Sequence, residues 1–413
     1  MTREILVLGA GMIGTCTALE LSLRGHAVTL VDRRPPGQET SFGNAGVIQR
    51  EAVKPYAFPR DARSLLSAAL GRGLEVHYHP RALLAALPQL WRYWRHSAPA
   101  RHQAIARDYA ALIAHATTEH ARYIALAGAD DLVRRDGLRL VFRTPRALDE
   151  AVRDAERVQR EHGVRFVAMD ADALAAAEPD FRTRLAGAVH WLPSWSVDDP
   201  GGLVERYAQA FLQRGGRFVQ ADATAARPSA HGWALETDQG RLEGAQAVVA
   251  LGPWSDRFVR ALGYRLPLFV KRGYHRHYRG GGRVTMPTLD AERGYVLAPQ
   301  RRGLRLTTGA EIAGIDAPLT PRQLTGAEAQ ARGLLELGEA VESEPWVGSR
   351  PCSADMKPVI GPAPRHPGLW FNFAHGHQGF TLGPASARLL ADLMTGEPPF
   401  IDAAPFLARR FGG

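Results

Sequence analysis

The sequence EILVLGAGMIG occupies residues 4–14 and leads from an apolar segment directly into a glycine-rich turn. The apolar segment predicts a buried β-strand, and residues 12–24 predict the helix that follows it. A second strand is expected over residues 27–31, and it leads to the acidic residue Asp32. This order of strand, glycine turn, helix, strand and acid predicts a βαβ unit that binds a dinucleotide.

Each residue type in the glycine turn has a physical role. Gly9 permits the tight turn, Gly11 lets the main chain approach a pyrophosphate, and Gly14 allows the helix to pack closely. Met12 and Ile13 begin the helix, whose N-terminus offers unpaired N–H groups and the positive end of a dipole to phosphates. These residues are therefore candidate cofactor ligands.

The acid and the loop after it narrow the choice of cofactor. Asp32 can accept hydrogen bonds from ribose hydroxyls and would repel a 2′-phosphate, so NADP is disfavoured, whereas FAD and NAD both fit. A polar, glycine-rich loop, ETSFGNAG, follows at residues 39–46. Such a loop can bring backbone and hydroxyl donors against a pyrophosphate and a flavin ring.

Bulk properties exclude several classes of protein. The chain has 413 residues, is 45% apolar, and has no uninterrupted apolar run long enough to cross a bilayer. We expect a soluble, cytoplasmic protein. Cys16 and Cys352 lack the spacing of a zinc site or a disulfide framework. The net charge of +9 comes without a nucleic-acid-binding motif, so nucleic acid is not an expected partner, whereas peripheral contact with the inner face of an anionic membrane fits.

The fold class expected from the whole chain is α/β, of a mixed α+β kind. Short strand-like runs alternate with glycine-rich turns over residues 266–308, as in an antiparallel sheet. A closing strand is expected at residues 369–374. Helices are predicted at residues 80–127, 146–162, 202–214, 325–342 and 386–394.

Motifs spread over the whole chain resemble a known family. They are AGMIG at residues 10–14, ETS with NAG at 39–46, VVALGPW at 248–254, LRLTTGAEIAG at 304–314, SRP at 349–351 and HGHQGFT at 375–381. Together they resemble the FAD-dependent D-amino-acid oxidase and glycine oxidase superfamily, and most of all its bacterial D-amino-acid dehydrogenase branch. Residues 60–161 match this family only in general character.

The resemblance implies two interleaved domains. A discontinuous, Rossmann-like FAD-binding domain would comprise residues 1–80, 200–260 and 345–413. A substrate-binding domain, built on a mixed and largely antiparallel sheet, would comprise residues 81–199 and 261–344. FAD is the cofactor that the resemblance implies.

The resemblance also assigns cofactor contacts. Gly9, Gly11, Gly14 and Asp32 would hold the ADP half, with Arg33 or Arg34 beside the ribose. The remaining expected contacts are Ser41, Asn44, Ala45 and Gly46 at the pyrophosphate and flavin, Thr224, Ala250, Leu251, Gly252 and Trp254 at the adenosine side, and Gly376, His377, Gln378, Gly379, Phe380 and Thr381 at the flavin pyrimidine edge.

Four residues are candidates for contact with the substrate. Arg350 matches the carboxylate-binding arginine of similar oxidases, and a guanidinium offers the planar fork that a carboxylate needs. Tyr274 would donate its hydroxyl to the same carboxylate. His375 and His377 would bind the substrate or tune its protonation, and their isolation from other ligands gives no metal site. The family more often has a small or hydroxylated residue at the position of His377.

The expected reaction is oxidative deamination of a D-amino acid to a 2-oxo acid through an imino acid, with hydride transfer to flavin N5. Electrons would pass to a quinone-type or other acceptor. Alternative substrates are D-proline or hydroxy-D-proline, and glycine. Dioxygen is the alternative acceptor. In another class of function, the chain would be a non-catalytic FAD-binding subunit of an electron-transfer complex.

Overall fold

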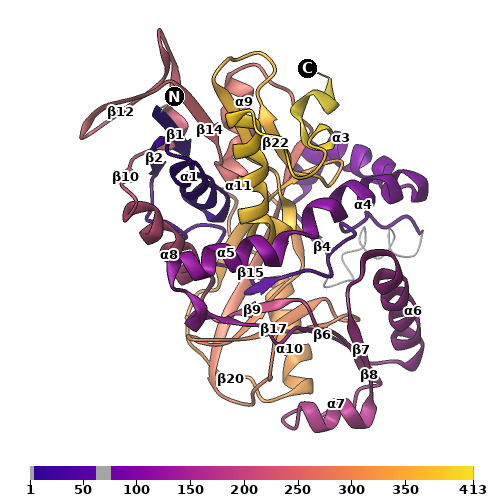
Figure 1. Cartoon of the computed structure of the whole chain (residues 1–413). Coiled ribbons are helices and arrows are strands. Elements are labelled where there is room, and N and C mark those ends of the chain that lie inside the picture. The colour runs from indigo at the N-terminus through magenta and orange to yellow at the C-terminus, as the bar shows by residue number, and fades with distance from the viewer. Residues whose placement is uncertain (1–3, 62–75, 413) are drawn as a thin grey trace.

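The computed structural model describes residues 4–61 and 76–412 (Figure 1). Its nucleotide-binding sheet has six strands in the order β10-β2-β1-β14-β23-β22. Five of them run parallel, and β22 is antiparallel at one edge. The bounds are β1 Glu4–Leu8, β2 Ala27–Asp32, β10 Arg217–Gln220, β14 Gln246–Val249, β22 Val359–Pro362 and β23 Leu369–Phe373. The predicted βαβ unit is confirmed at the centre of this sheet.

Helices from both ends of the chain cover this sheet. Helix α1 (Met12–Leu23) packs against α11 (Gly379–Thr395), and Figure 1 shows the two side by side. Arg24, just after α1, forms an ion pair with Asp392 of α11 at 2.5 Å. The helices α4 (Pro99–Ile113), α5 (Ala116–Ala127) and α8 (Pro200–Leu212) pack against the same layer. The beginning and end of the chain therefore form one hydrophobic core.

A second, larger sheet forms the other half of the molecule. Its strands follow the order β4-β19-β15-β18-β17-β16-β6-β8-β7, and β20 and β21 also pair with β15. Most pairings are antiparallel, whereas β4–β19 and β6–β16 are parallel. The bounds are β4 Val76–Tyr78, β6 Leu138–Phe142, β7 Phe166–Asp170, β8 Gly187–Trp191, β15 Leu268–Gly280, β16 Thr288–Asp290, β17 Tyr295–Gln300, β18 Gly303–Thr307, β19 Ala310–Ile312, β20 Gly338–Ala340 and β21 Trp346–Ser353.

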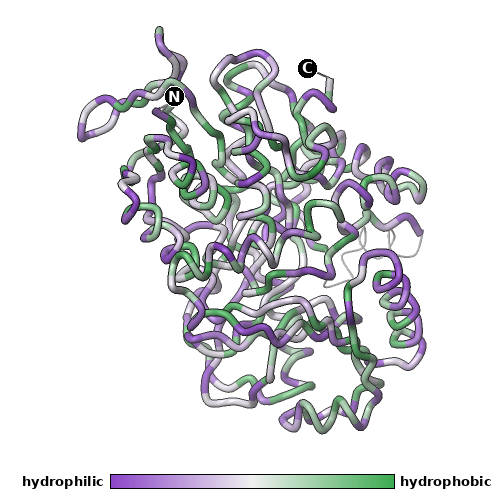
Figure 2. The backbone as a smooth tube through the Cα atoms, viewed as in Figure 1, coloured by the Kyte–Doolittle hydropathy of each residue, from purple (hydrophilic) through white to green (hydrophobic). Residues whose placement is uncertain are grey.

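Smaller elements complete the chain. The helix α6 lies at the outer edge of the second sheet, where Figure 2 shows many hydrophilic residues along it. The other helices are α3 Pro80–His96, α6 Pro145–His162, α7 Ala171–Ala177, α9 Ser255–Ala261 and α10 Arg322–Leu334. Two three-stranded sheets comprise β3 Val47–Ile48, β5 Val133–Arg134 and β9 Trp195–Val197, and β11 Arg227–Ser229, β12 Gly232–Thr237 and β13 Gly240–Gly244.

Three helical predictions differ clearly from the structure. The segment expected to be helical at 80–127 forms three separate helices, α3, α4 and α5. The helix expected at 325–342 ends at Leu334, because residues 338–340 form β20 against β15. The helix expected at 386–394 begins at Gly379, so its N-terminus lies nearer the glycine-rich motif before it. Part of the chain between 60 and 161 falls on residues 62–75, which lie outside the described residues.

The division into domains remains a proposal, and the structure shows how three segments pack. Helices α4 and α5, expected in the substrate domain, lie against α11 of the nucleotide-binding half. Strand β4 lies in the large sheet through its pairing with β19. Strand β21 lies in the large sheet as well. Among the described residues, no helix is long and apolar enough to cross a membrane.

Candidate functional site

A large cavity of about 1120 Å³ extends from the nucleotide-binding sheet to strand β15 of the large sheet. One end is lined by the glycine turn after β1 and by the segment after β14, at the carboxyl ends of parallel strands. That is where open α/β sheets bind nucleotides. The other end is lined by β15, β21 and aromatic residues from β4 and α3. The two halves of the molecule thus share one cavity.

The glycine turn has the geometry of a phosphate-binding site. Gly9, Gly11, Met12 and Ile13 line the cavity, and α1 begins at Gly11 without a side-chain cap. Gly14 does not line the cavity. It allows α1 to pack closely, since a Cβ at this position would lie 1.7 Å from the carbonyl oxygen of Gly9. The N–H groups of this first turn, other than that of Met12, which Ser41 Oγ accepts, can donate to an anion in the cavity.

Asp32 lies beside the glycine turn and is hydrogen-bonded to it. Its Oδ2 accepts a hydrogen bond from the main-chain N–H of Ala10 at 2.6 Å, and burial raises its pKa. Arg33 lines the cavity with its guanidinium 4.1 Å from the ring centroid of Trp254. Arg34, by contrast, is not among the cavity residues. Both guanidinium groups form an ion pair with Glu39 Oε1, at 2.7 Å for Arg33 and 3.2 Å for Arg34. Arg33 is therefore the better placed of the two arginines.

The expected adenosine-side residues all reach the same end of the cavity. They come from the short helical turn after β10 and from the segment that joins β14 to α9. The structure places there Thr224, Ala250, Leu251, Gly252 and Trp254.

The loop at residues 39–46 lies between the two ends. Ser41 lines the cavity, and its Oγ accepts a hydrogen bond from the N–H of Met12 at 2.9 Å, which ties the loop to α1. Asn44 and Ala45 also line the cavity. Gly46 does not, because its backbone packs against Val197. The loop therefore supplies three of the four residues expected from it.

The C-terminal motif brings a second helix N-terminus to the cavity. Gly376, His377, Gly379 and Phe380 line it, and α11 begins there without a side-chain cap. Gln378 and Thr381 are not among the lining residues. Their side chains instead contact the chain after the loop, since Gln378 Nε2 donates to Gln49 Oε1 and Thr381 Oγ1 accepts from the N–H of Gln49.

These features fit a flavin dinucleotide. Two helix N-termini, of α1 and α11, face one cavity, and each favours negative charge. The first suits a pyrophosphate. The second suits the negative charge that reduction places on the pyrimidine edge of a flavin.

Arg350 lies at the opposite end of the cavity. Its guanidinium donates to the main-chain oxygens of Gly309 at 2.9 Å and Thr308 at 3.4 Å. Within the described residues no carboxylate lies within 4.0 Å of it. A guanidinium has five N–H donors, so several stay available. The expected carboxylate-binding arginine therefore faces the cavity with donors free for a ligand.

Tyr274 is among the residues that line the cavity, but its hydroxyl already has partners within the protein. Side chains alternate along a strand, and on β15 Lys271 and Gly273 face the cavity with Arg350. Tyr274 projects to the other face, where its hydroxyl donates to Glu311 Oε2 at 2.8 Å. Its hydroxyl therefore supports the wall of the site, and its expected hydrogen bond to the substrate carboxylate stays a prediction.

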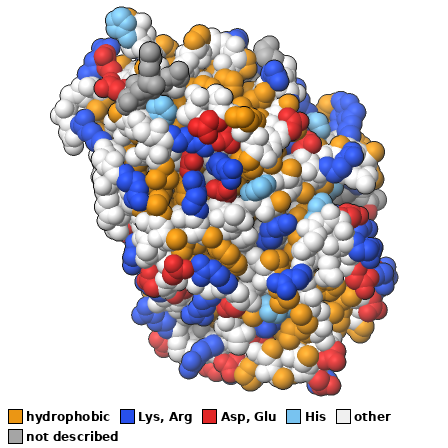
Figure 3. All heavy atoms as spheres, in the orientation of Figure 1, with side chains coloured by type: hydrophobic (Ala, Val, Ile, Leu, Met, Phe, Trp, Pro, Cys, Tyr) orange, Lys and Arg blue, Asp and Glu red, His pale blue; other side chains and the backbone are white. Residues whose placement is uncertain are grey.

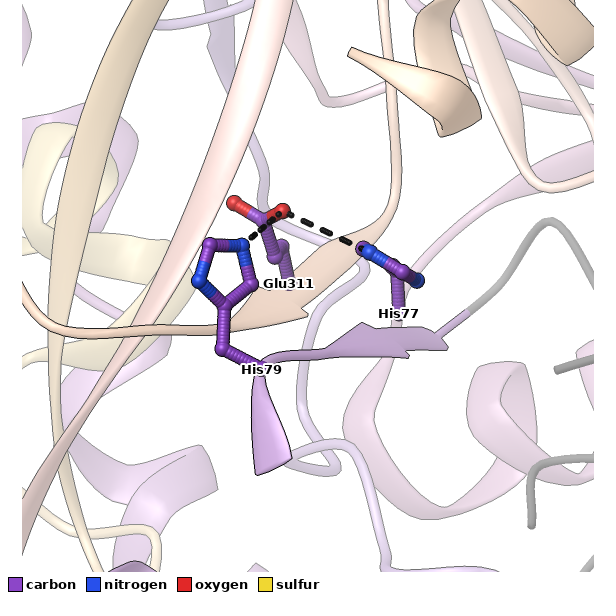
Figure 4. Close-up of side chains that lie close together, drawn as sticks. All are labelled: His77, His79 and Glu311. Atoms are coloured by element: carbon purple, nitrogen blue, oxygen red, sulfur yellow. Dashed lines mark ion pairs between the residues drawn. The ribbon is translucent and has the colours of Figure 1, made fainter. Parts of the chain in front are cut away.

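Figure 4 shows the side chains beside Tyr274, where His77 and His79 approach Glu311. The nearest oxygen, Oε1, is 3.3 Å from His79 Nε2 and 4.0 Å from His77 Nε2. Two histidines and a carboxylate can bind a metal. Here, however, Oε1 also accepts the hydroxyl of Thr320, and Arg272 neutralises Oε2 at 2.6 Å. The carboxylate is already satisfied, and we interpret the cluster as a link between β4, β19 and β15.

The two candidate histidines differ in their surroundings. His375 is buried, and its Nε2 is 2.9 Å from Ser386 Oγ of α11; burial lowers its pKa to about 3. His377 faces the cavity, with its ring centroid 5.2 Å from that of Tyr56. Burial, and then the charges of Arg350 and Lys271, hold the pKa of His377 well below its ordinary value. Both histidines are neutral at physiological pH, and both are among the residues that line the cavity, although the Nε2 of His375 is engaged by Ser386.

Several cavity residues were missed in the sequence. The most important of them is Lys271. Its position three residues before the candidate Tyr274 could have drawn attention to it. The aromatic residues came from segments that carry no motif. Residues missed at this end of the cavity are Phe58, Tyr78, Tyr93, Lys271 and Gly273.

Gly273 offers a direct test of the position of Arg350. A Cβ at Gly273 would lie 2.5 Å from Arg350 Nη2, so Gly273→Ala must displace the guanidinium. We expect kcat/KM for the best amino-acid substrate to fall about 10- to 100-fold, mostly through KM, because a misplacement of about 1 Å has that cost. Steady-state kinetics with measured FAD content would check this. Unchanged KM in a variant that retains FAD would contradict the role given to Arg350.

Comparison with known proteins shows the family. The sequence model of the family described as FAD dependent oxidoreductase matches residues 4–393. A D-amino acid dehydrogenase of Cereibacter sphaeroides is 33% identical over 445 aligned residues, covering 99% of this chain and 95% of that protein. A D-amino-acid oxidase of Bradyrhizobium diazoefficiens is 30% identical, with 99% of each chain covered.

A solved structure shows the same fold. The crystal structure of glycine oxidase from Geobacillus kaustophilus aligns with a TM-score of 0.70 at 21% identity, and the alignment covers 100% of both chains. The match of the family over nearly the whole chain agrees with the nucleotide-binding geometry described above. The chain therefore belongs to the family of FAD dependent oxidoreductases, and FAD is its cofactor.

Proposed function

We propose that this oxidoreductase oxidises free D-amino acids to 2-oxo acids. The observation that carries the proposal is Arg350, whose guanidinium faces the cavity that the dinucleotide motifs also line and has no carboxylate partner among the described residues. A planar guanidinium suits the α-carboxylate of an amino acid. The names of the curated relatives, D-amino acid dehydrogenase and D-amino-acid oxidase, support the choice of substrate.

The residues of the cavity bind and orient the substrate. Bound FAD would supply the acceptor for the hydride that leaves the substrate Cα. Arg350 fixes the carboxylate, and the aromatic side chains of Tyr56, Tyr78 and Tyr93 surround the remainder. The amine reacts in its neutral form, the Cα–N bond becomes an imine, and water then releases a 2-oxo acid and ammonia. His377 is neutral and adds no positive charge beside the amine.

We further propose that electrons pass to a quinone-type or other acceptor at an anionic membrane surface. The net charge of +9 supports attraction to such a surface. Figure 3 shows basic side chains interspersed with acidic ones on the face in view, so the support comes from overall charge and not from one patch.

The proposal predicts that anaerobic addition of D-amino acids bleaches the flavin absorbance, whereas the L-enantiomers do not. The panel should include glycine and cyclic amino acids. Because the pKa of His375 is about 3 and that of His377 lies well below 6.5, neither titrates between pH 6 and 9. The bleaching rate should therefore rise with pH over this range as the amine loses its proton. Retained FAD that no amino acid bleaches would refute the proposal.

Reoxidation can be followed in the same experiment. With a quinone or dye present, we expect rapid recovery of the yellow colour. With air alone, recovery should be slow and accompanied by little hydrogen peroxide. Stoichiometric peroxide at a comparable rate would instead identify an oxidase.

A further inference from the structure

Lys271 is a second cation in the substrate end of the cavity. The chain has three lysines, and two of them have carboxylate partners: Lys54 with Asp154 at 3.1 Å, and Lys357 with Asp108 at 2.7 Å. Lys271 has no carboxylate within 4.0 Å among the described residues, although it lines the cavity. A desolvated ammonium without a counter-ion is costly. The ammonium of Lys271 therefore has no counter-ion in the part of the protein that the structure describes, and an anionic group of a ligand could provide one.

The charges of Lys271 and Arg350 point in different directions. The two residues are directly paired across β15 and β21, so their side chains leave the same face of the sheet. The guanidinium of Arg350 lies over Gly273 toward the Gly309 carbonyl oxygen. The ammonium of Lys271 instead lies 4.5 Å from the ring centroid of Tyr93 and 5.5 Å from that of Phe269. The charges diverge along β15, which suits two anionic groups better than one.

The neighbours of Lys271 hold it in place without neutralising it. Nζ donates to the Tyr93 hydroxyl at 3.4 Å, and that hydroxyl donates to the main-chain oxygen of Tyr56 at 2.5 Å. Burial lowers the pKa of Lys271, the charge of Arg350 lowers it further, and Cys352 opposes this shift. A bound anion would favour the charged ammonium. The flanking rings of Phe58 and Tyr93, in edge contact at 5.3 Å between centroids, can pack against methylene groups.

We propose that the preferred substrate carries a second carboxylate, with the α-carboxylate on Arg350 and the side-chain carboxylate on Lys271. The substrate class is thus the acidic D-amino acids, D-aspartate and D-glutamate. This inference rests on the proposed function, since it assumes that a D-amino acid occupies the cavity.

The test compares each acid with its neutral isostere. For the FAD-bound enzyme, kcat/KM for D-aspartate should exceed that for D-asparagine about 10- to 100-fold, the range expected for one hydrogen bond to a charged group. The same should hold for D-glutamate and D-glutamine. Lys271→Met should abolish this preference, and Lys271→Arg should retain part of it. Arg146→Met removes one positive charge from an exposed pair on α6 and should leave the preference unchanged.

A binding measurement on the wild-type enzyme makes the test independent of how the variants fold. Succinate should perturb the flavin absorbance at a lower concentration than succinamate, its half-amide. Equal binding of the two, or equal turnover of D-aspartate and D-asparagine, would overturn the inference while leaving D-amino-acid oxidation intact. An unchanged acid-to-amide ratio in Lys271→Met would also overturn it. If no amino acid bleaches the flavin, the proposed function fails instead.

Discussion

Arg350→Met is expected to lower kcat/KM for D-amino acids about 10²- to 10⁴-fold while FAD remains bound. The substitution removes two charge-assisted hydrogen bonds to the α-carboxylate, each contributing about 1.5–3 kcal/mol, and every 1.4 kcal/mol is a factor of ten. Methionine should be tolerated, because Arg350 donates only to main-chain oxygens of Thr308 and Gly309 and forms no ion pair within the described residues. Steady-state kinetics and FAD content would measure the two effects separately.

Two comparisons identify the lost interaction as the one to the carboxylate. Arg350→Lys should recover only part of the activity, because an ammonium is a point charge without the planar fork. D-alaninamide, which lacks the carboxylate, should be a poor substrate for the wild-type enzyme and should not become much poorer in Arg350→Met. Equal losses for D-alanine and D-alaninamide would mean that Arg350 supports the cavity wall and does not bind the carboxylate.

The sequence predicts the nucleotide-binding half well because its signals are local. The turn at Gly9, Gly11 and Gly14 and the acid at Asp32 lie within one contiguous βαβ unit, so their spacing alone defines the geometry. The structure confirms the unit and places Asp32 beside the turn through its hydrogen bond to Ala10. Even the helix end near Gly25 follows from the local sequence.

The substrate half depends on long-range pairing that the sequence does not reveal. Alternation along β15 separates Gly273 from Tyr274, but which face meets the cavity is set by the pairing of β15 with β21. The engagement of the Tyr274 hydroxyl by Glu311 is therefore not visible in the sequence, and its contact with the substrate stays a prediction. Lys271 was overlooked for a related reason, since the lack of a counter-ion becomes visible only when all neighbours are in place. Likewise, α10 ends early because β20 pairs with a strand far away in sequence.

Gly14→Ala should produce a protein that fails to retain FAD. The added Cβ would lie 1.7 Å from the carbonyl oxygen of Gly9, which is main chain and cannot rotate away as a flexible side chain would. Helix α1 must then move from β1, at a cost of about 3 kcal/mol or more, the upper range of overpacking. That movement also withdraws the helix N-terminus from the site where it meets a pyrophosphate. Flavin absorbance after purification and the thermal unfolding midpoint would measure both consequences.

Gly333→Ala is the matched control for this prediction. Gly333 lies within helix α10, and a Cβ there would meet no atom within 4 Å. Because alanine is favoured over glycine in a helix by about 1 kcal/mol, this variant should keep its FAD and be as stable as the wild type or slightly more so. Since the two substitutions are chemically identical, a difference between them reports the close contacts at Gly14, of which the one with the Gly9 carbonyl oxygen is the shortest. A Gly14→Ala variant that bound FAD as tightly as Gly333→Ala would show that close packing of α1 on β1 is not what positions the nucleotide.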